Sequence, residues 1–341
     1  MRNHRMYLFN FMWNIISKTW YILSVRRKET KWARVRLREL EQQLGGRLDD
    51  VTFHKVITSY GIYNPMMCDA FTRLRGRVSN RAERDRMLHY FICSSLFDNF
   101  CDRKELDQES LYEISFSPTV YQPKSFDESL FLYAHLLLKN YVRDKQWYET
   151  VTHRLYEAQE DSARQFNPSI TDEEIEQITL HKGGYSVLLC HFYLDDPAGK
   201  EEQQCWYLIG GIIQLTNDLY DIYKDYQEGI VTLPNRMQDA YAFHDYFTGK
   251  ITQLKKEIAA LPFPNKTKQH LNISLMGICS FGLIAIKQLQ KIQRQADALP
   301  NLKQLPRKQL IVDMEKPANL YYCMRQVYLH AKKLHQEKQF E

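Results

Sequence analysis

Residues 206–234 read WYLIGGIIQLTNDLYDIYKDYQEGIVTLP, and the interpretation of the whole chain starts from this stretch. On a helix, six of its residues recur at steps of four and three and therefore share one face: Trp206, Gly210, Gln214, Asn217, Asp221 and Asp225. The lower half of this face carries an amide and two carboxylates, with about 6 Å between neighbours. Such a stack of oxygen ligands suits Mg²⁺ and leaves positions open for water or phosphate. The alternative is an exposed acidic helix end.

A second acidic stretch, residues 91–105, reads FICSSLFDNFCDRKE. Asp98 and Asp102 lie one helical turn apart, and like charges at this spacing destabilise a helix unless a cation lies between them. Both follow an apolar run that we expect to be buried. The two acidic helices therefore predict two walls that face each other across one cavity, lined by Phe91, Ser94, Ser95 and Gln214.

These two stretches resemble the motifs of the class I isoprenoid synthases. Gln214 to Asp225, followed by Gly229, Leu233 and Pro234, is similar to the second aspartate motif of squalene and phytoene synthases. It also fits the Asn-Asp-x-x-Ser-x-x-x-Glu pattern of terpene cyclases, with Asp221 in the serine place and Asp225 in the glutamate place. The first stretch looks like that of the large-terpene (tetraprenyl-β-curcumene-type) synthases. That motif carries an additional upstream aspartate, where this chain has Ser94 and Ser95.

The resemblance implies a Mg²⁺-dependent enzyme that ionises a prenyl diphosphate. Five residues would hold the metal and act in catalysis: Asp98, Asp102, Asn217, Asp221 and Asp225. We expect three Mg²⁺ ions, with Mn²⁺ as a substitute. A helix break beside the diphosphate is typical of the family, and we expect one at Lys182-Gly183-Gly184, with Lys182 binding the diphosphate. Arg325 is a second candidate for that role. The alternatives are an ordinary turn at the glycines and a packed terminal helix around Arg325.

Three functions remain open from the sequence. The first is a terpene synthase, a lyase that cyclises one prenyl diphosphate or eliminates diphosphate from it. The second is a head-to-head prenyltransferase of the squalene/phytoene type. The third is a non-catalytic helical protein with the same fold.

Composition predicts the all-α class, and the resemblance implies a single-domain isoprenoid-synthase bundle around a central active-site cavity. Glycine and proline are sparse, at 13 and 11 among 341 residues, and long stretches with a helical period dominate. We expect helices near 51–74, 81–102, 126–166, 200–228, 235–262, 265–298 and 315–334, and another that begins at about 172. Residues 103–125 are expected to be a loop. The arginines between residues 73 and 86 are expected to form a solvated turn, with the alternative that one of them reaches the diphosphate. Asp195-Asp196-Pro197 is expected to be a surface turn, and the alternative is another acidic site.

The N-terminal segment 1–40 differs from the helical domain 41–341. Residues 1–41 contain ten Lys/Arg and three Glu, a charge of +7, so the remainder of this +5 chain carries about −2. The body is therefore not basic, which argues against nucleic acid as a partner. Residues 5–25 are aromatic and apolar but interrupted by polar side chains, so they do not resemble a transmembrane span. One alternative is an interfacial helix that contacts a membrane peripherally, and the other is a first bundle helix packed on the body.

Seven scattered cysteines without a Cys-x-x-Cys motif predict reduced thiols and a cytoplasmic protein, with the membrane surface as the alternative location. The expected partner is a prenyl diphosphate substrate. The protein is expected to be a monomer or a homodimer.

Overall fold

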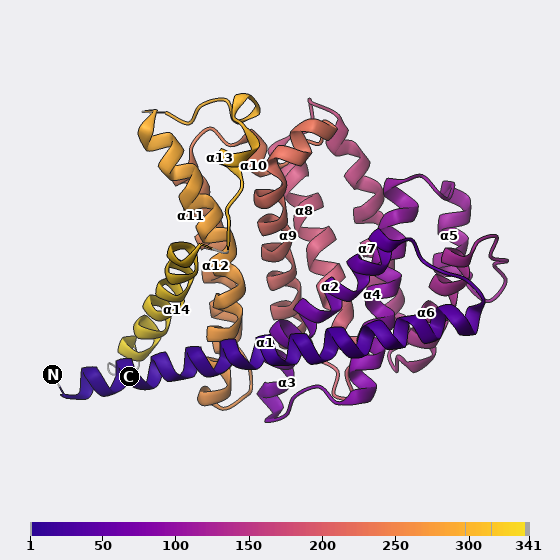
Figure 1. Cartoon of the computed structure of the whole chain (residues 1–341), viewed down its shortest axis with the longest axis horizontal. Helices are drawn as coiled ribbons and strands as arrows, with labels where there is room; N and C mark the ends of the chain where they lie inside the picture. Colours follow the sequence, from indigo (N-terminus) through magenta and orange to yellow (C-terminus); the bar gives the residue numbers. More distant parts are fainter. Residues whose placement is uncertain (1, 297, 315, 338–341) are drawn as a thin grey trace. The chain divides into compact units, whose positions relative to one another are not determined.

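The computed structural model describes residues 2–296, 298–314 and 316–337, and every regular element within these ranges is a helix (Figure 1). The predicted all-α class is confirmed. The chain divides into two compact units, described here one at a time: Met1–Tyr148 with Cys190–Pro197, and Glu149–Leu189 with Ala198–Glu341. All seven cysteines are free, and six of them are buried.

The first unit begins with one long helix, α1 (Arg2–Leu44). It runs without a break past residue 40, where the N-terminal segment distinguished in the sequence ends. Its second half packs on the unit through Ala33, Leu37 and Leu40, all of which are fully buried. The helix ends before Gly45, whose φ of 70° is accessible to glycine at little cost. The side chains of residues 1–16 and Thr19 lie outside the described residues.

A π-helical turn at Asn64-Pro65 interrupts the helix expected near residues 51–74. The α2 helix (Asp50–Tyr63) continues into η1 (Asn64–Cys68), then into α3 (Asp69–Thr72) and the 3₁₀ turn η2 (Arg73–Arg75). Proline at the second position of η1 cannot supply a backbone N–H, which interrupts the regular α-helical ladder.

The first aspartate motif ends helix α4 (Arg81–Asp102), with the bounds predicted from the sequence. A capping box starts this helix: Asn80 accepts a hydrogen bond from the backbone N–H of Glu83, and the Glu83 carboxylate accepts one from the N–H of Asn80. The loop expected over 103–125 is wrong in part. It contains helix α5 (Gln108–Phe116), which Asp107 caps by accepting a hydrogen bond from the N–H of Ser110. Helix α6 (Phe126–Tyr141) then packs on α4.

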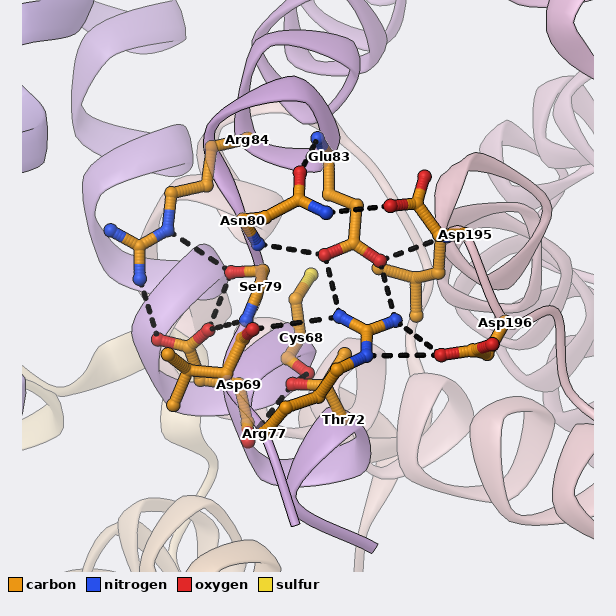
Figure 2. Close-up of polar contacts among 12 residues, drawn as sticks. Cys68, Asp69, Thr72, Arg77, Ser79, Asn80, Glu83, Arg84, Asp195 and Asp196 are labelled. Carbon is orange, nitrogen blue, oxygen red and sulfur yellow. Dashed lines mark hydrogen bonds and ion pairs between the residues drawn. The ribbon is translucent and has the colours of Figure 1, made fainter. Parts of the chain in front are cut away.

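Two of the arginines expected in a solvated turn, Arg77 and Arg84, bind buried acids. Figure 2 shows Arg77 between Glu83 and Asp196, with nitrogen–oxygen distances of 2.7 and 2.8 Å to the two oxygens of Glu83. Arg84 contacts Asp69 in the same network. Both Glu83 and Asp69 are fully buried. Because a buried carboxylate needs a charged partner, these arginines hold the unit together and are not free to bind a ligand.

The turn at Asp195-Asp196-Pro197 belongs to this network. Asp196 is exposed, as predicted for a surface turn, and it pairs with Arg77. Asp195 accepts hydrogen bonds from Asn80 and Arg86. The preceding 3₁₀ turn η4 (Cys190–Tyr193) packs on α4.

The second unit is built around the contact of α8 with α9 and the packing of α11 and α12 on α9. Most of α7 (Lys145–Asp161) belongs to it, so residues 126–166 form two helices, α6 and α7, followed by the 3₁₀ turn η3 (Ser162–Phe166). The other elements of the unit are α8 (Asp172–Leu189), α9 (Lys200–Glu228), α10 (Leu233–Arg236), α11 (Ala240–Ala260), α12 (Asn265–Gln295), η5 (Leu302–Gln304), α13 (Arg307–Leu310) and α14 (Pro317–Glu337).

Helix α8 begins where the capping box predicts. The Thr171 hydroxyl accepts a hydrogen bond from the N–H of Glu174, and the Glu174 carboxylate accepts one from the N–H of Thr171. Ile170 and Ile175 lie in one buried cluster, so apolar residues on the two sides of the helix start form a hydrophobic staple.

The expected helix break at Gly183-Gly184 is wrong, because α8 runs without interruption to Leu189. A Cβ atom on Gly183 would lie 2.4 Å from the carbonyl oxygen of Gly210 on α9, and one on Gly210 would lie 2.3 Å from that of Gly183. The two helices run side by side in Figure 1 and approach each other through these glycines. The paired glycines thus permit close packing of two helix backbones, which explains why they are tolerated in a helix interior.

Helix α12 is the one described helix that is long and apolar enough to cross a membrane by length and composition. Two thirds (67%) of its most apolar window is buried inside the protein, as in a core helix.

Candidate functional site

The acidic face of α9 is the centre of the candidate site, and Asp218 and Asp225 are its buried carboxylates. The Gln214 side chain donates a hydrogen bond to Asp218 Oδ1 at 2.8 Å, and the Thr179 hydroxyl of α8 donates one to Oδ2 at 3.3 Å. Gln214, Asp218, Asp221 and Asp225 follow one another at steps of four, three and four, so they line one side of α9.

Two carboxyl groups on this face bind protons unusually tightly. Burial raises the pKa of Asp218 to about 6, although the hydrogen bond from Gln214 and the charge of Lys182 oppose the rise. Burial, followed by the negative charges of Asp218 and Asp221, raises the pKa of Asp225 to about 7. The Thr232 hydroxyl, at the start of α10, lies 3.5 Å from Asp225 Oδ2. The acidic face of α9 therefore carries more negative charge than the neighbouring positive groups balance.

Lys182 on α8 is the cation that the structure brings close to Asp218. It is half-buried, and its positive charge lowers the pKa of that carboxyl group. This is the residue expected to bind a diphosphate. It occupies the place one turn after Thr179, on an unbroken helix rather than at a break.

Helix α11 adds a tyrosine and a lysine beside the same face. The Tyr246 hydroxyl is buried and has no hydrogen-bond partner among the described residues. Burial, and then the negative charges of Glu176 and Asp218, raises the pKa of Tyr246. Lys250 donates a hydrogen bond to Glu176 at 2.6 Å and lies over the Tyr246 ring. Glu176 is thus neutralised by Lys250, whereas the positive charge of Lys182 acts on Asp218 and that of Lys224 acts on Asp225.

The predicted ligands Asn217 and Asp221 are both exposed, and Asp225 is buried. The sequence reasoning missed Asp218, whose neighbour Asn217 was chosen instead. Asp218 fits the same spacing, four residues after Gln214 and three before Asp221. When two adjacent polar residues both lie at the edge of the same helix face, the helical period alone does not show which of them is buried.

The first aspartate motif lies in the other unit, where Asp98 has a protein partner. Lys55 of α2 lies 3.1 Å from Asp98 Oδ2, and Asp98 is 36% exposed. Asp102 is exposed at the end of α4. A metal ion at Asp98 would therefore have to displace Lys55 as the partner of this carboxylate.

The residues expected to line a cavity beside the first motif are largely covered. Phe91 stacks on Tyr63 with a ring separation of 5.9 Å, and Ser95 is buried. Ser94 is half-buried. In the second unit Gln214 is half-buried, and Arg325 is exposed on α14.

A metal ion fits the α9 face when phosphate oxygens of a substrate complete its coordination. Among the residues that the structure describes, no three His, Cys, Asp or Glu side chains form a group that could hold a metal ion by themselves. Mg²⁺, however, is commonly held by one or two carboxylates together with phosphate oxygens of a substrate. Asp218 and Asp225, whose charges lack compensation, match that donor set better than an all-protein cage.

Comparisons with known proteins add no relative to this description. No protein-family model matches the chain. No curated protein matches it either.

Proposed function

We propose that this protein is a class I terpene synthase, which ionises a prenyl diphosphate and releases diphosphate. The observation that carries the proposal is the side of α9 with Gln214, Asp218 and Asp225, where burial raises two carboxyl pKa values to about 6 and about 7. Raised carboxyl pKa values next to a lysine are a common property of functional sites. The motif resemblance of residues 214–234 and 91–105 supplies the reaction class.

The residues of α9 would hold the metal. Asp218 and Asp225 are the buried ligands, and Asp221 and Asn217 are the solvent-accessible ones. Asp98 and Asp102 are proposed as the ligands of the first motif. When bound, Mg²⁺ supplies Lewis-acid neutralisation of the negative charge that develops on the leaving diphosphate.

The remaining side chains position charge around this face. Lys182 supplies a positive charge close to Asp218 that binds a diphosphate oxygen. The hydrogen bonds from Gln214 and Thr179 hold the Asp218 carboxylate in one orientation. The close backbone contact of Gly183 and Gly210 keeps α8, and with it Lys182, at a constant distance from α9. Preorganised charge of this kind is usually the largest catalytic contribution in such a site.

The direct test is a product assay. Purified protein is incubated with Mg²⁺ and prenyl diphosphates of increasing chain length, and the organic extract is examined by mass spectrometry. A hydrocarbon or alcohol with the substrate's own carbon count supports the proposal. A product of doubled carbon count would instead establish a head-to-head prenyltransferase.

Variants connect that assay to the α9 face. We expect Asp218→Asn to lower turnover by a factor on the order of 10² to 10³, the usual effect of losing one preorganised charge in a catalytic site. Asp245→Asn, an exposed aspartate on α11, serves as the matched control and should retain full turnover. Equal turnover of wild type and Asp218→Asn would refute the assignment of this site.

A further inference from the structure

Helix α1 presents large apolar side chains to solvent near its N-terminal end. Trp20 is 71% exposed and Leu23 is 57% exposed. The steps of three and four residues that separate them continue along the helix through three exposed basic residues, Arg27, Lys31 and Arg34. These five residues form one outward face, which we call the basic-aromatic face.

The charge of this part of α1 is of one sign. Arg26 and Lys28, next to the basic-aromatic face, are also exposed. Between Trp20 and Arg38 the sequence contains one acid, Glu29. Glu29 is fully buried, and its carboxylate pairs with Arg81 at 2.9 Å and Arg84 at 2.7 Å. No other acid within this stretch of α1 therefore offsets the five exposed positive charges from residue 26 to residue 34.

The opposite side of the helix already has its packing partners. Ala33, Leu37 and Leu40 are buried within the first unit. The Tyr21 hydroxyl donates a hydrogen bond to Asp69 at 2.7 Å, which holds α1 on the unit as far toward its N-terminus as residue 21. The basic-aromatic face is thus not needed for packing, yet it exposes a tryptophan and a leucine.

We propose that the basic-aromatic face of α1 docks on the surface of an anionic phospholipid bilayer. Tryptophan and leucine followed by lysine and arginine on one helix face match the headgroup boundary, where apolar side chains insert and basic side chains meet lipid phosphates. The same spacing continues in the sequence through Ile16, Trp13 and Phe9, which lengthens the apolar part of the pattern. This proposal is independent of the proposed catalytic function.

Charge decides between a bilayer and the other partners of such a face. A second copy of this chain would bring five positive charges against five others, which disfavours association through this face. A nucleic acid would use the basic residues but would leave Trp20 and Leu23 without an apolar environment. An anionic bilayer satisfies both halves of the face at once.

The test is co-sedimentation of the full-length protein with vesicles of phosphatidylserine and phosphatidylcholine. We expect binding to these vesicles, weaker binding at high salt, and much weaker binding to pure phosphatidylcholine. The double variant Arg27→Glu/Lys31→Glu should bind at least about 25-fold more weakly, because each basic residue near an anionic surface contributes about fivefold. Lys303→Glu/Lys308→Glu is the control of equal charge change and should bind like the wild type.

A second variant examines the apolar half of the face. Trp20→Ala/Leu23→Ala should weaken vesicle binding about tenfold or more, with the salt dependence retained. Far-ultraviolet circular dichroism should show unchanged helicity for all variants, since the altered side chains are exposed.

Three results would overturn the proposal. The first is equal binding of wild type and Arg27→Glu/Lys31→Glu to anionic vesicles, and the second is equal binding of the wild type to anionic and neutral vesicles. The third is that the wild type does not bind vesicles but forms a dimer or a nucleic-acid complex, which the same variants abolish.

Discussion

Asp218 and Asp225 remain protonated at higher pH than ordinary surface carboxylates do. Their pKa values lie at about 6 and about 7 in the folded protein, above the ordinary aspartate value of 3.8. Between about pH 4 and pH 7 the folded state therefore binds more protons than the unfolded chain. The contribution of these groups to the free energy of unfolding is fully present at the acidic end of that window and is lost as pH rises through it.

The Asp218→Asn variant should remove part of this pH dependence. The amide keeps the shape of the side chain and has no charge to desolvate, so at pH 8 the ligand-free variant should be more stable than the wild type by about 2 kcal/mol. At pH 4 the two should be nearly equal. Urea unfolding across this range measures the difference, and Asp221→Asn, at an exposed carboxylate on the same helix, is the control. An identical pH slope in wild type and Asp218→Asn would contradict the assigned burial of this charge.

Glu29 provides the contrasting case of a buried carboxylate with full compensation. It accepts hydrogen bonds from Tyr60, Arg81 and Arg84. We expect Glu29→Gln to lower the free energy of unfolding by about 3 kcal/mol, because two arginines lose their buried counter-charge. Glu39→Gln, at an exposed position on the same helix, should change it by less than about 0.5 kcal/mol. Chemical denaturation of both variants measures the two effects, and comparable losses would show that the buried network is not what stabilises α1.

At the scale of elements, the contact between α8 and α9 determines the geometry of the candidate site. The backbones approach through Gly183 and Gly210, so the Lys182 and Asp218 side chains start from helices held at short range. Gly184 and Gly211 are similarly covered, by Tyr207 and Leu180. The two adjacent glycines on each helix thus allow the helices to pack closely and do not form a turn.

Gly210→Ala should separate these helices. The added Cβ would lie 2.3 Å from the Gly183 carbonyl oxygen, so the backbones must move apart, at a cost of about 1–3 kcal/mol in stability. Gly249→Ala on α11, where nothing lies within 4 Å of the added Cβ, should instead stabilise the protein by up to about 1 kcal/mol. Thermal unfolding compares the two. If Gly210→Ala were as stable as Gly249→Ala, the close approach would not be required.

At the scale of the whole molecule, we expect the uncompensated charge of α9 to couple folding to ligand binding. A ligand that binds only the folded protein stabilises it in proportion to the logarithm of its concentration. Under the proposed function, Mg²⁺ with inorganic pyrophosphate would bring cations to Asp218 and Asp225 and an anion to Lys182. Both effects should act in the same direction above pH 7, where these carboxylates are ionised.

Mg²⁺ and pyrophosphate together should therefore raise the unfolding temperature of the wild type at pH 8. At a hundredfold excess over the dissociation constant the gain is about 2.7 kcal/mol. Asp218→Asn and Lys182→Ala should each reduce the shift, and Asp245→Asn should retain it. Differential scanning fluorimetry with Mg²⁺ alone, pyrophosphate alone and both together measures the coupling. An absence of any shift in the wild type would count against a metal–diphosphate site on α9.

Helix bounds followed from local chemistry and were largely predictable. The capping boxes at Asn80 and Thr171 mark helix starts that depend only on residues a turn apart. Gly45 ends α1 because few other residues adopt its backbone conformation. Likewise, the acidic face of α9 could be recognised from the spacing of Gln214, Asp221 and Asp225. Local sequence therefore determined the all-α class, most of the element bounds and the place of the candidate site.

Tertiary structure alone decided which polar residues are compensated. Gly183-Gly184 could be a break or a packing surface, and the partner glycine on α9 makes it the latter. The arginines after residue 73 could be solvated, and three distant carboxylates, Asp69, Asp195 and Asp196, bind them instead. Asp98 has Lys55 as its partner, and Asp218 is buried beside Thr179. The physical reason is that the helical period shows only the direction in which each side chain leaves its own helix. Burial and ion pairing depend on residues brought from elsewhere in the chain.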